Sequence, residues 1–170
     1  MEGRDIPLGL ARPDDAPALA LMSRDLIETG LGWAYRAERI ARMIGDSETA
    51  TIVARDGASA AGFATMTFGA ERAHLVLLAV CAPYRRRGIA RRMIAWLRAT
   101  AVTAGIASIH VELRAGNPGA YALYRATGFT EILRLPGYYR GRETAIRMLC
   151  QLRVHEGAPL SWRPPTRDRQ

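Results

Sequence analysis

The sequence predicts an α/β (α+β) domain that is built on a mixed β-sheet. Stretches with the two-residue period of β-strands alternate with stretches whose apolar residues recur at helical spacing. One apolar run, residues 73–80, is nearly continuous, as expected of a strand that is covered on both faces. With 170 residues, 49% of them hydrophobic, the chain has the size and apolar content of one globular domain.

Helix-start charges, helix breaks and turn residues predict the helices and strands of the N-terminal half. Asp14 and Asp15 place favourable charge at the start of a helix, and the stretch TGLGW ends that helix before a second one begins. The pair Asp56-Gly57 between two β-rich runs is typical of a hairpin turn. In order, this half is predicted to form strand 5–13, helices 16–28 and 35–46, a hairpin over 49–69 and strand 73–80.

The C-terminal half is predicted from periodicity and from helix caps. Apolar residues recur at helical spacing after Gly88, and residues 108–114 alternate between apolar and polar as a half-buried strand does. Asn117 is expected to cap a helix that Gly128 ends. In order, this half is predicted to form a helix from 88, strand 108–114, a helix over 117–128, and strands 129–136 and 143–154 joined by 137–142. The complete order is β-α-α-β-β-β-α-β-α-β-β.

Composition and segment lengths limit the domain organisation and the setting of the protein. We expect one domain over residues 1–154 and a tail over residues 155–170 that is rich in proline and arginine. No apolar run approaches the roughly 20 residues needed to span a bilayer, and the first residues lack the layout of a signal peptide. The two cysteines fit neither a disulfide framework nor a metal motif. The expected setting is the cytoplasm, with no membrane partner and no metal.

The charge of the chain is strongly positive. All 24 basic residues are arginine, and the formal net charge is +8. This balance suits phosphate-bearing or acidic partners, and a genomic bias toward arginine is the alternative explanation for the choice of arginine. A nucleic-acid-binding domain ranks last among the functions considered, because the sequence lacks a recognition helix and an aromatic stacking strand. We therefore expect no nucleic-acid partner.

The segment between strand 73–80 and the following helix has the features of a phosphate site. A loop at this position places main-chain N–H groups without helical partners at the positive end of a helix dipole. Gly88 lets the backbone approach a ligand closely, and the preceding run of arginines adds charge and forked donors. On its own, this combination also fits a solvated run of charge.

Two motifs together resemble those of the GCN5-related N-acetyltransferases. Arg85-x-x-Gly88-x-Ala90 is similar to the acetyl-CoA pyrophosphate loop of that family, which has Gln or Arg, two residues, Gly, one residue, and Gly or Ala. The stretch NPGAYALYRATGF, which begins at Asn117, resembles the second half of the family's cofactor site. The two motifs flank strand 108–114, as the family's topology requires. The resemblance covers about residues 4–154 and implies the acyl-CoA N-acyltransferase fold.

The resemblance implies acetyl-CoA as a cosubstrate, with no metal, and it implies which residues contact it. Main-chain groups of Leu78, Ala79 and Val80 are expected to hold the pantetheine arm and the thioester carbonyl, with the Val80 N–H as the oxyanion donor. The other expected contacts are Arg85, Arg86, Arg87, Gly88, Ile89, Ala90, Arg91 and Asn117. Arg92 is expected to be solvated.

Glu112 and Tyr124 are the expected catalytic residues. The family uses the tyrosine at the position of Tyr124 to stabilise or protonate the departing thiolate of CoA. A base is needed because an alkylammonium is mostly protonated at neutral pH. Glu112 is the first choice, since VELR resembles the segment that carries the base in ribosomal-protein N-terminal alanine acetyltransferases. A solvent-facing or salt-bridged carboxylate, for example one paired with Arg114, is the structural alternative for Glu112, and His74 is the rival base.

The acceptor is expected to be a primary amine, and the α-amine of a protein or peptide is favoured. The stretch GYYRGRETAIRM resembles the last hairpin of the ribosomal-protein alanine acetyltransferases. Tyr138 and Tyr139 are therefore expected to flank the acceptor, with Trp33 opposite them. A small-molecule amine is the alternative acceptor, and a non-catalytic acyl-CoA sensor is the alternative function, because fold does not determine function.

Overall fold

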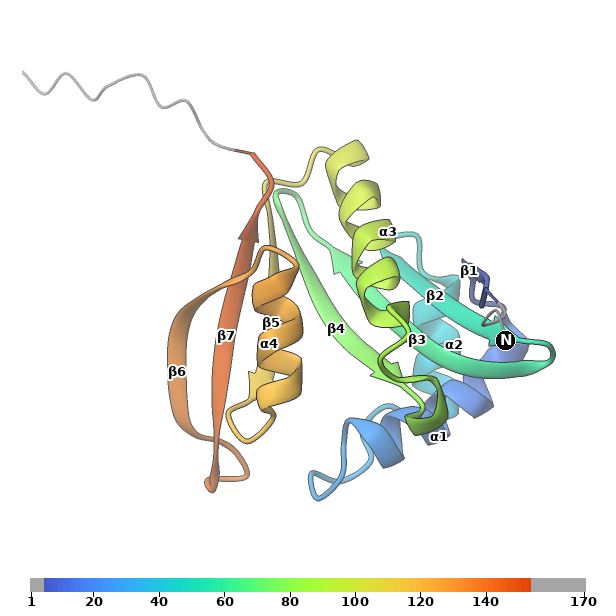
Figure 1. Ribbon diagram of the computed structural model, residues 1–170, viewed down its shortest axis with the longest axis horizontal. Coiled ribbons are helices and arrows are strands. Elements are labelled where there is room, and N and C mark those ends of the chain that lie inside the picture. The colour runs from blue at the N-terminus through green and yellow to red at the C-terminus, as the bar shows by residue number, and fades with distance from the viewer. Residues whose placement is uncertain (1–4, 154–170) are drawn as a thin grey trace, which may run out of the picture.

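The structure, a computed structural model, describes residues 5–153 and contains the predicted order of strands and helices (Figure 1). The elements are β1 (Leu8–Leu10), α1 (Ala16–Leu26), α2 (Ala37–Gly45), β2 (Thr49–Asp56), β3 (Ser59–Phe68), β4 (Arg72–Val80), α3 (Ile89–Thr103), β5 (Ser108–Arg114), α4 (Pro118–Ala126), β6 (Thr130–Tyr139) and β7 (Glu143–Gln151). Single-turn 3-10 helices precede α1 and follow β4. The tail predicted over residues 155–170 lies outside the described residues.

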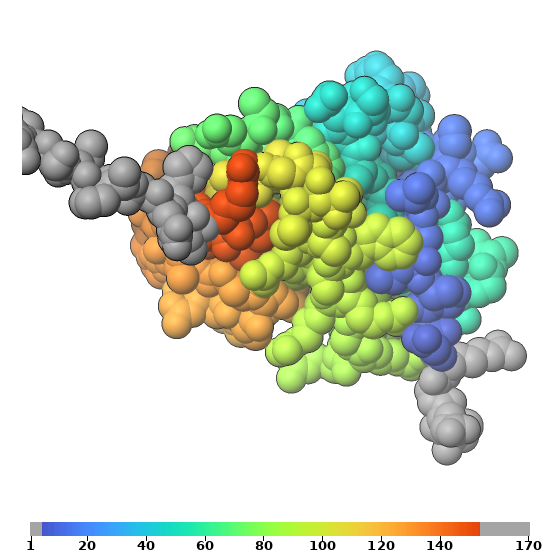
Figure 2. Space-filling model, turned by 90° about the horizontal axis from the view of Figure 1, so that it is seen from above, coloured from blue at the N-terminus to red at the C-terminus, as the bar shows by residue number. Residues whose placement is uncertain are grey.

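The strands form one mixed sheet in the order β1-β2-β3-β4-β5-β7-β6. β4 and β5 are parallel, and the other neighbouring strands are antiparallel. Parallel strands need a long crossover, and α3 provides it. Seen from above, α3 separates the blue N-terminal segments from the orange C-terminal strands (Figure 2). The predicted mixed sheet is therefore confirmed.

Helices cover both faces of the sheet, with α3 and α4 on one face and α1 and α2 on the other (Figure 1). Leu19 of α1 and Ile40 of α2 are buried in a cluster with Phe63 of β3. Met93 and Leu97 of α3 are buried in a larger cluster on the opposite face. Among residues 5–153, no helix is long and apolar enough to cross a membrane.

β4 and β5 separate halfway along their length. The two strands pair over Arg72–Leu75 and Ser108–Val111, and β4 then continues to Val80 without β5 as its neighbour. The register of β4 against β3 shifts by one residue at Val76. Such a bulge bends a strand and increases its twist. The bend opens a gap between the two parallel strands.

The prediction that β4 is buried on both faces is wrong, and the bulge explains which face each half of the strand buries. Its residues instead alternate between buried and more exposed positions. Leu75, before the bulge, packs into the cluster beneath α3, whereas Leu77 packs into the cluster beneath α1 and α2. An extra residue in a strand changes the face to which the following side chains point. Leu78 and Val80 therefore point to the face that carries α3 and α4, where both are partly buried.

Two strands have different lengths from those predicted. β1 is limited to Leu8–Leu10, inside the predicted strand 5–13. β6 continues to Tyr139 instead of ending at residue 136. Gly137 has a φ of +67°, and the pairing of β6 with β7 is irregular around it. The chain therefore passes Pro136 and resumes the strand, which shortens the expected connection.

Candidate active site

The end of β4 presents a main-chain edge to the gap between β4 and β5. Ala79 pairs with Phe63 of β3, so the opposite edge of this segment is the one that faces the gap. A Cβ on Gly62 would lie 2.9 Å from the carbonyl oxygen of Ala79, so glycine allows β3 to run this close. The structure thus brings Leu78, Ala79 and Val80 to the gap, and their contact with a thioester stays a prediction.

The loop after β4 carries exposed arginines to the start of α3. These arginines are Arg85, Arg86, Arg87 and Arg91. The Nε of Arg85 donates a hydrogen bond of 3.0 Å to the main-chain oxygen of Val80, which holds this side chain against the strand end. The guanidinium of Arg87 lies 5.6 Å from the ring centroid of Tyr84. This group of positive charges fits a polyanion such as a pyrophosphate, and binding by each arginine stays a prediction.

Gly88 shapes the turn from this loop into α3. It is the N-cap of the helix and has a φ of +75°, while Arg86 has a φ of +64°. Residues with positive φ in a turn gather main-chain N–H groups into a concavity that suits an anion. Ile89 is buried and Ala90 is partly buried, so packing anchors the first turn of the helix behind these N–H groups.

A Gly88→Ala variant is expected to bind acetyl-CoA several-fold more weakly. The left-handed conformation costs a residue with a Cβ about 1 kcal/mol, and nothing lies within 4 Å of the added Cβ. Gly105→Ala is the matched control, because Gly105 also has a φ of +75° and free space around it but lies after α3. Calorimetric titration with acetyl-CoA measures the affinities. Equal affinities in the two variants would contradict a role of Gly88 in the phosphate loop.

Asn117 at the start of α4 and Arg92 near the start of α3 each had a predicted environment. Asn117 was predicted to cap α4, and its Oδ1 accepts a hydrogen bond of 3.0 Å from the Ala120 N–H, which confirms the cap. Arg92 was predicted to be solvated, and it is so only in part, since its side chain is 40% exposed. Its Nη1 donates to the carboxylate of Asp5 at 3.0 Å and to the main-chain oxygen of Ile6 at 2.9 Å, because α3 lies beside the N-terminal segment.

Tyr124 is buried in α4 on the side of the helix that faces the sheet. Its exposed fraction is 6%, and its ring packs edge-on against Phe129 at a centroid distance of 5.4 Å. Burial raises the pKa of the Tyr124 phenol well above its ordinary value of 10.0. The phenol is therefore a hydrogen-bond donor throughout the physiological pH range.

Glu112 is held by two donors from the C-terminal hairpin. Its Oε1 accepts a hydrogen bond of 2.9 Å from Nε of Arg147, and its Oε2 accepts one of 2.9 Å from the hydroxyl of Tyr138. Glu112 is thus salt-bridged, as the structural alternative expects, but its partner is Arg147. The partner named in that alternative, Arg114, pairs with Glu143 instead. Sequence reasoning missed Arg147. The signal lies in the alignment of β5 with β7, where Glu112 is directly opposite Arg147.

These contacts keep the Glu112 carboxyl charged. Its partial burial opposes ionisation, but the hydrogen bonds from Arg147 and Tyr138, together with the charge of Arg147, outweigh that effect. The net result is a pKa of Glu112 below its ordinary value of 4.5. Glu112 is thus an oriented carboxylate of low basicity, which affects how it can accept a proton.

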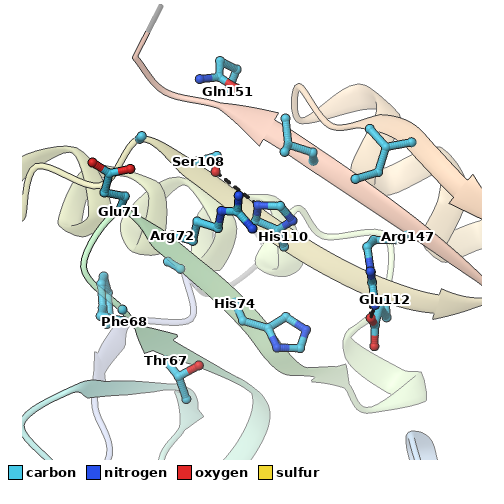
Figure 3. Close-up of a pocket in the computed structure, with 15 residues that line it drawn as sticks. Thr67, Phe68, Glu71, Arg72, His74, Ser108, His110, Glu112, Arg147 and Gln151 are labelled. Atoms are coloured by element: carbon cyan, nitrogen blue, oxygen red, sulfur yellow. Dashed lines mark hydrogen bonds and ion pairs between the residues drawn. The ribbon is translucent and has the colours of Figure 1, made fainter. Parts of the chain in front are cut away.

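A cavity of about 940 Å³ extends from Glu112 over the face of the sheet that carries α1 and α2 (Figure 3). Its polar lining includes Arg72, His74, Ser108, His110, Glu112 and Arg147. Desolvation by the surrounding residues lowers the pKa of His74 below its ordinary value of 6.5, and it does the same to His110. The rival base His74 and the first choice Glu112 therefore share one cavity. Among residues 5–153, no group of three His, Cys, Asp or Glu side chains is placed to hold a metal ion.

The three aromatic residues expected around the acceptor have different surroundings. Tyr138 and Tyr139 lie on β6 and pack edge-on at 5.1 Å, and Tyr138 is the one that reaches Glu112. Burial raises the pKa of Tyr139 to about 12. Trp33 donates from Nε1 to the main-chain oxygens of Ala20 and Tyr35, each at 3.2 Å. Trp33 therefore fixes the connection between α1 and α2, and its contact with an acceptor stays a prediction.

Arg114 ties this connection to the C-terminal hairpin. Its Nη2 donates to the main-chain oxygens of Ile27 at 3.1 Å and Thr29 at 2.7 Å. Its Nη1 lies 3.3 Å from the carboxylate of Glu143, and its guanidinium lies 5.6 Å from the ring centroid of Tyr139. One side chain on β5 thus holds two segments that are far apart in sequence.

An Arg114→Gln variant is expected to raise the acceptor KM several-fold without changing the KM for acetyl-CoA. The shorter, neutral side chain cannot bridge both segments, so their relative position is less restricted. Steady-state kinetics with each substrate varied in turn measures the two constants. Arg134→Gln is the control, because it removes an ion pair with Glu131 within β6 only. An unchanged acceptor KM in Arg114→Gln would contradict this positioning role.

The structure has a mixed sheet in which two parallel strands diverge, and a loop with arginines and a glycine follows the first of them. These features are typical of the acyl-CoA N-acyltransferase fold. The family model described as the acetyltransferase (GNAT) family matches residues 20–129. This match covers more than half of the chain, and the chain belongs to this family.

Relatives of known activity and structure are similar to this chain. The [Ribosomal protein bS18]-alanine N-acetyltransferase of Escherichia coli (strain K12) is 36% identical over 91 residues, which are 52% of this chain and 62% of the relative. An N-alpha-acetyltransferase of Saccharolobus solfataricus is 26% identical over 86% of this chain and 93% of its own length. The crystal structure of the ribosomal-protein-S18-alanine N-acetyltransferase from Escherichia coli superposes with a TM-score of 0.76 at 25% identity and covers 89% of this chain and 97% of that one.

Proposed function

We propose that the protein is an N-acetyltransferase that transfers the acetyl group of acetyl-CoA directly to a primary amine, the α-amine of a protein or peptide. The separation of β4 from β5 carries this proposal. It leaves the end of β4 without β5 as its neighbour, between the arginine loop and Glu112 on β5, and we take Tyr124 of α4 to face the same gap. The names of the relatives, which act on α-amines, support the choice of acceptor.

The gap suits acetyl-CoA in both charge and shape. Its diphosphate fits the arginine loop and the first N–H groups of α3, where the helix dipole adds positive potential. Its pantetheine arm is an extended chain with amide groups, which can pair with the free edge of β4 as an added strand does. The acetyl thioester then lies at Val80, between Glu112 and Tyr124.

The transfer needs a neutral amine, a stabilised oxyanion and a stabilised leaving group. The amine nitrogen attacks the acetyl carbonyl carbon, the C–S bond breaks, and the sulfur leaves as a thiolate. The N–H of Val80 is the proposed donor to the carbonyl oxygen as negative charge develops on it. The hydroxyl of Tyr124 donates a hydrogen bond to the departing sulfur. The amine gives up one proton, which passes to the base and then to water.

Glu112 is the proposed base, acting through a water molecule. Its low pKa makes it a weak acceptor, but its charge stabilises the ammonium that forms as the amine attacks. Arg147 and Tyr138 fix the direction of the carboxylate, so its oxygens need no reorientation during the reaction. His74 is neutral near pH 7 and lines the same cavity, and it is the alternative acceptor of the proton.

An acceptor screen with released CoA as the readout tests the proposal. The acceptors are peptides that differ in their first residue, the same peptides with blocked N-termini, and small amines such as polyamines and amino acids. We expect turnover with free peptide N-termini and none with blocked ones. Turnover with small amines alone would reassign the acceptor. Acetyl-CoA binding without turnover on any amine would contradict the enzyme and favour an acyl-CoA sensor.

A further inference from the structure

Two segments near the proposed base lie at the lower end of the molecule in Figure 1, and a side chain of one reaches the other. They are residues 27–39, which join α1 to the first turn of α2, and the β6–β7 turn, residues 140–142. Nη2 of Arg140 lies 2.5 Å from the position that a Cβ on Gly32 would occupy, so glycine leaves room for this contact. Tyr138, just before the turn, donates to Glu112. We call these two segments the acceptor rim.

The acceptor rim carries four exposed arginines. They are Arg36 and Arg39 on the first segment, and Arg140 and Arg142 on the second. The guanidinium of Arg36 lies 4.9 Å from the ring centroid of Trp33, and that of Arg39 lies 4.1 Å from the ring centroid of Tyr35. Stacking on an aromatic face holds a cation in place while it remains open to solvent. These charges are therefore positioned beside the site.

Carboxylates of this region do not neutralise the four arginines. Among the residues that the structure describes, none of the four has a carboxylate oxygen within 4.0 Å. Glu28 is buried and accepts hydrogen bonds from Ser23 and from main-chain N–H groups, and Glu143 is paired with Arg114. Glu38 on α2 offsets one positive charge.

We infer that the acceptor rim selects peptides whose residues directly after the reactive amine are acidic. This inference rests on the proposed function, because the rim borders the acceptor only if the amine reacts beside Glu112. Opposite charges raise the rate of productive encounter and oppose acceptors of the wrong sign. We therefore expect kcat/KM for the acceptor to depend on the charge of the peptide, whereas the KM for acetyl-CoA stays the same.

Three peptides that differ only at positions two and three test the inference with the full chain. Both positions are Glu in the first peptide, Gln in the second and Lys in the third, and all begin with Ala. At low ionic strength we expect kcat/KM to be about 10-fold higher for the Glu peptide than for the Gln peptide, and lowest for the Lys peptide. The difference is expected to shrink in 0.5 M salt, because the Debye length then falls to about 4 Å.

Charge reversal separates the rim from the overall positive charge. An Arg36→Glu, Arg140→Glu double variant is expected to lose the preference for the Glu peptide and to accept the Lys peptide at least as well. Arg42→Glu, Arg134→Glu changes the net charge equally at exposed positions outside the rim and is expected to keep the preference. The KM for acetyl-CoA shows that neither double variant has lost the cofactor site.

The outcomes separate this inference from the proposed function. If all three peptides are acetylated at equal kcat/KM, or if both double variants respond alike, the inference is overturned while the proposed function stands. If no peptide is acetylated, both are overturned. A Glu preference that only the rim variant loses supports both.

Discussion

A Tyr124→Phe variant is expected to acetylate amines about 100-fold more slowly than the wild-type protein, with its affinity for acetyl-CoA unchanged. The substitution removes only the phenol oxygen, so the ring keeps its packing against Phe129. In the proposed mechanism, the lost hydrogen bond acts on the departing sulfur, which becomes charged only as the reaction proceeds. The substitution is therefore expected to lower kcat, which is measured as CoA release, and calorimetry measures the affinity for acetyl-CoA.

Tyr121→Phe is the matched control for this prediction. Tyr121 lies almost one turn earlier on α4, and its phenol interacts with Glu131 on β6. The same atom is removed from the same helix, and no change in kcat is expected. A normal kcat in Tyr124→Phe would remove Tyr124 from the catalytic residues.

The raised pKa of Tyr124 determines how this residue appears in a pH profile. Its phenol remains protonated at and above pH 10, because burial opposes the phenolate. A thiol ionises near 8.5, so full transfer of the phenol proton to the thiolate is strongly uphill. We therefore expect Tyr124 to act as a hydrogen-bond donor and to cause no fall in rate between pH 8 and 10.

A Glu112→Gln variant is expected to lower kcat by about 100-fold, again without weakening acetyl-CoA binding. Glutamine keeps the size of the side chain and an oxygen that can accept from Arg147 or Tyr138. It removes the negative charge that stabilises the ammonium formed as the amine attacks, and with it the group that is proposed to accept the amine proton through water. Because the pKa of Glu112 is held below its ordinary value of 4.5, its charge persists as the pH falls to 5. Any wild-type fall in rate between pH 7 and 5 then reflects protonation of another group.

His74→Gln is the comparison that assigns the base. If Glu112→Gln turns over normally and His74→Gln does not, the base is His74. In that case, the rate has to fall with decreasing pH through a value below 6.5, because the pKa of His74 is lowered. Thermal unfolding of both variants is the control for folding, since Glu112→Gln also removes the ion pair with Arg147.

The order of the elements was predictable because it depends on local signals. Two-residue and helical periods, the Asp56-Gly57 turn and the Asn117 cap each involve neighbours in sequence, and the structure confirms them. The end of β6 was not predictable in this way. Pro136 is typical of a strand end, but Gly137 bends the chain past it and pairing with β7 resumes at Tyr139.

The residues of the candidate site were likewise predictable where they belong to a local motif, and not where they depend on strand pairing. Glu112 and Tyr124 were recognised from motifs, and the structure places them on β5 and α4, while their catalytic roles stay predictions. Arg147 was missed because its role depends on lying opposite Glu112, and that register is set by the pairing of strands 35 residues apart. Arg114 was matched to the wrong carboxylate for the same reason.

The sequence by itself determined the family, the order of the elements and the loop in which arginines precede Gly88. Each of these features depends on residues that are close together in the chain. Only the tertiary structure decided that a bulge at Val76 opens the gap beside β4, that Arg147 and Tyr138 hold Glu112, and that the acceptor rim gathers four exposed arginines. These features depend on contacts between distant segments, because the sheet and not the chain order determines which side chains meet.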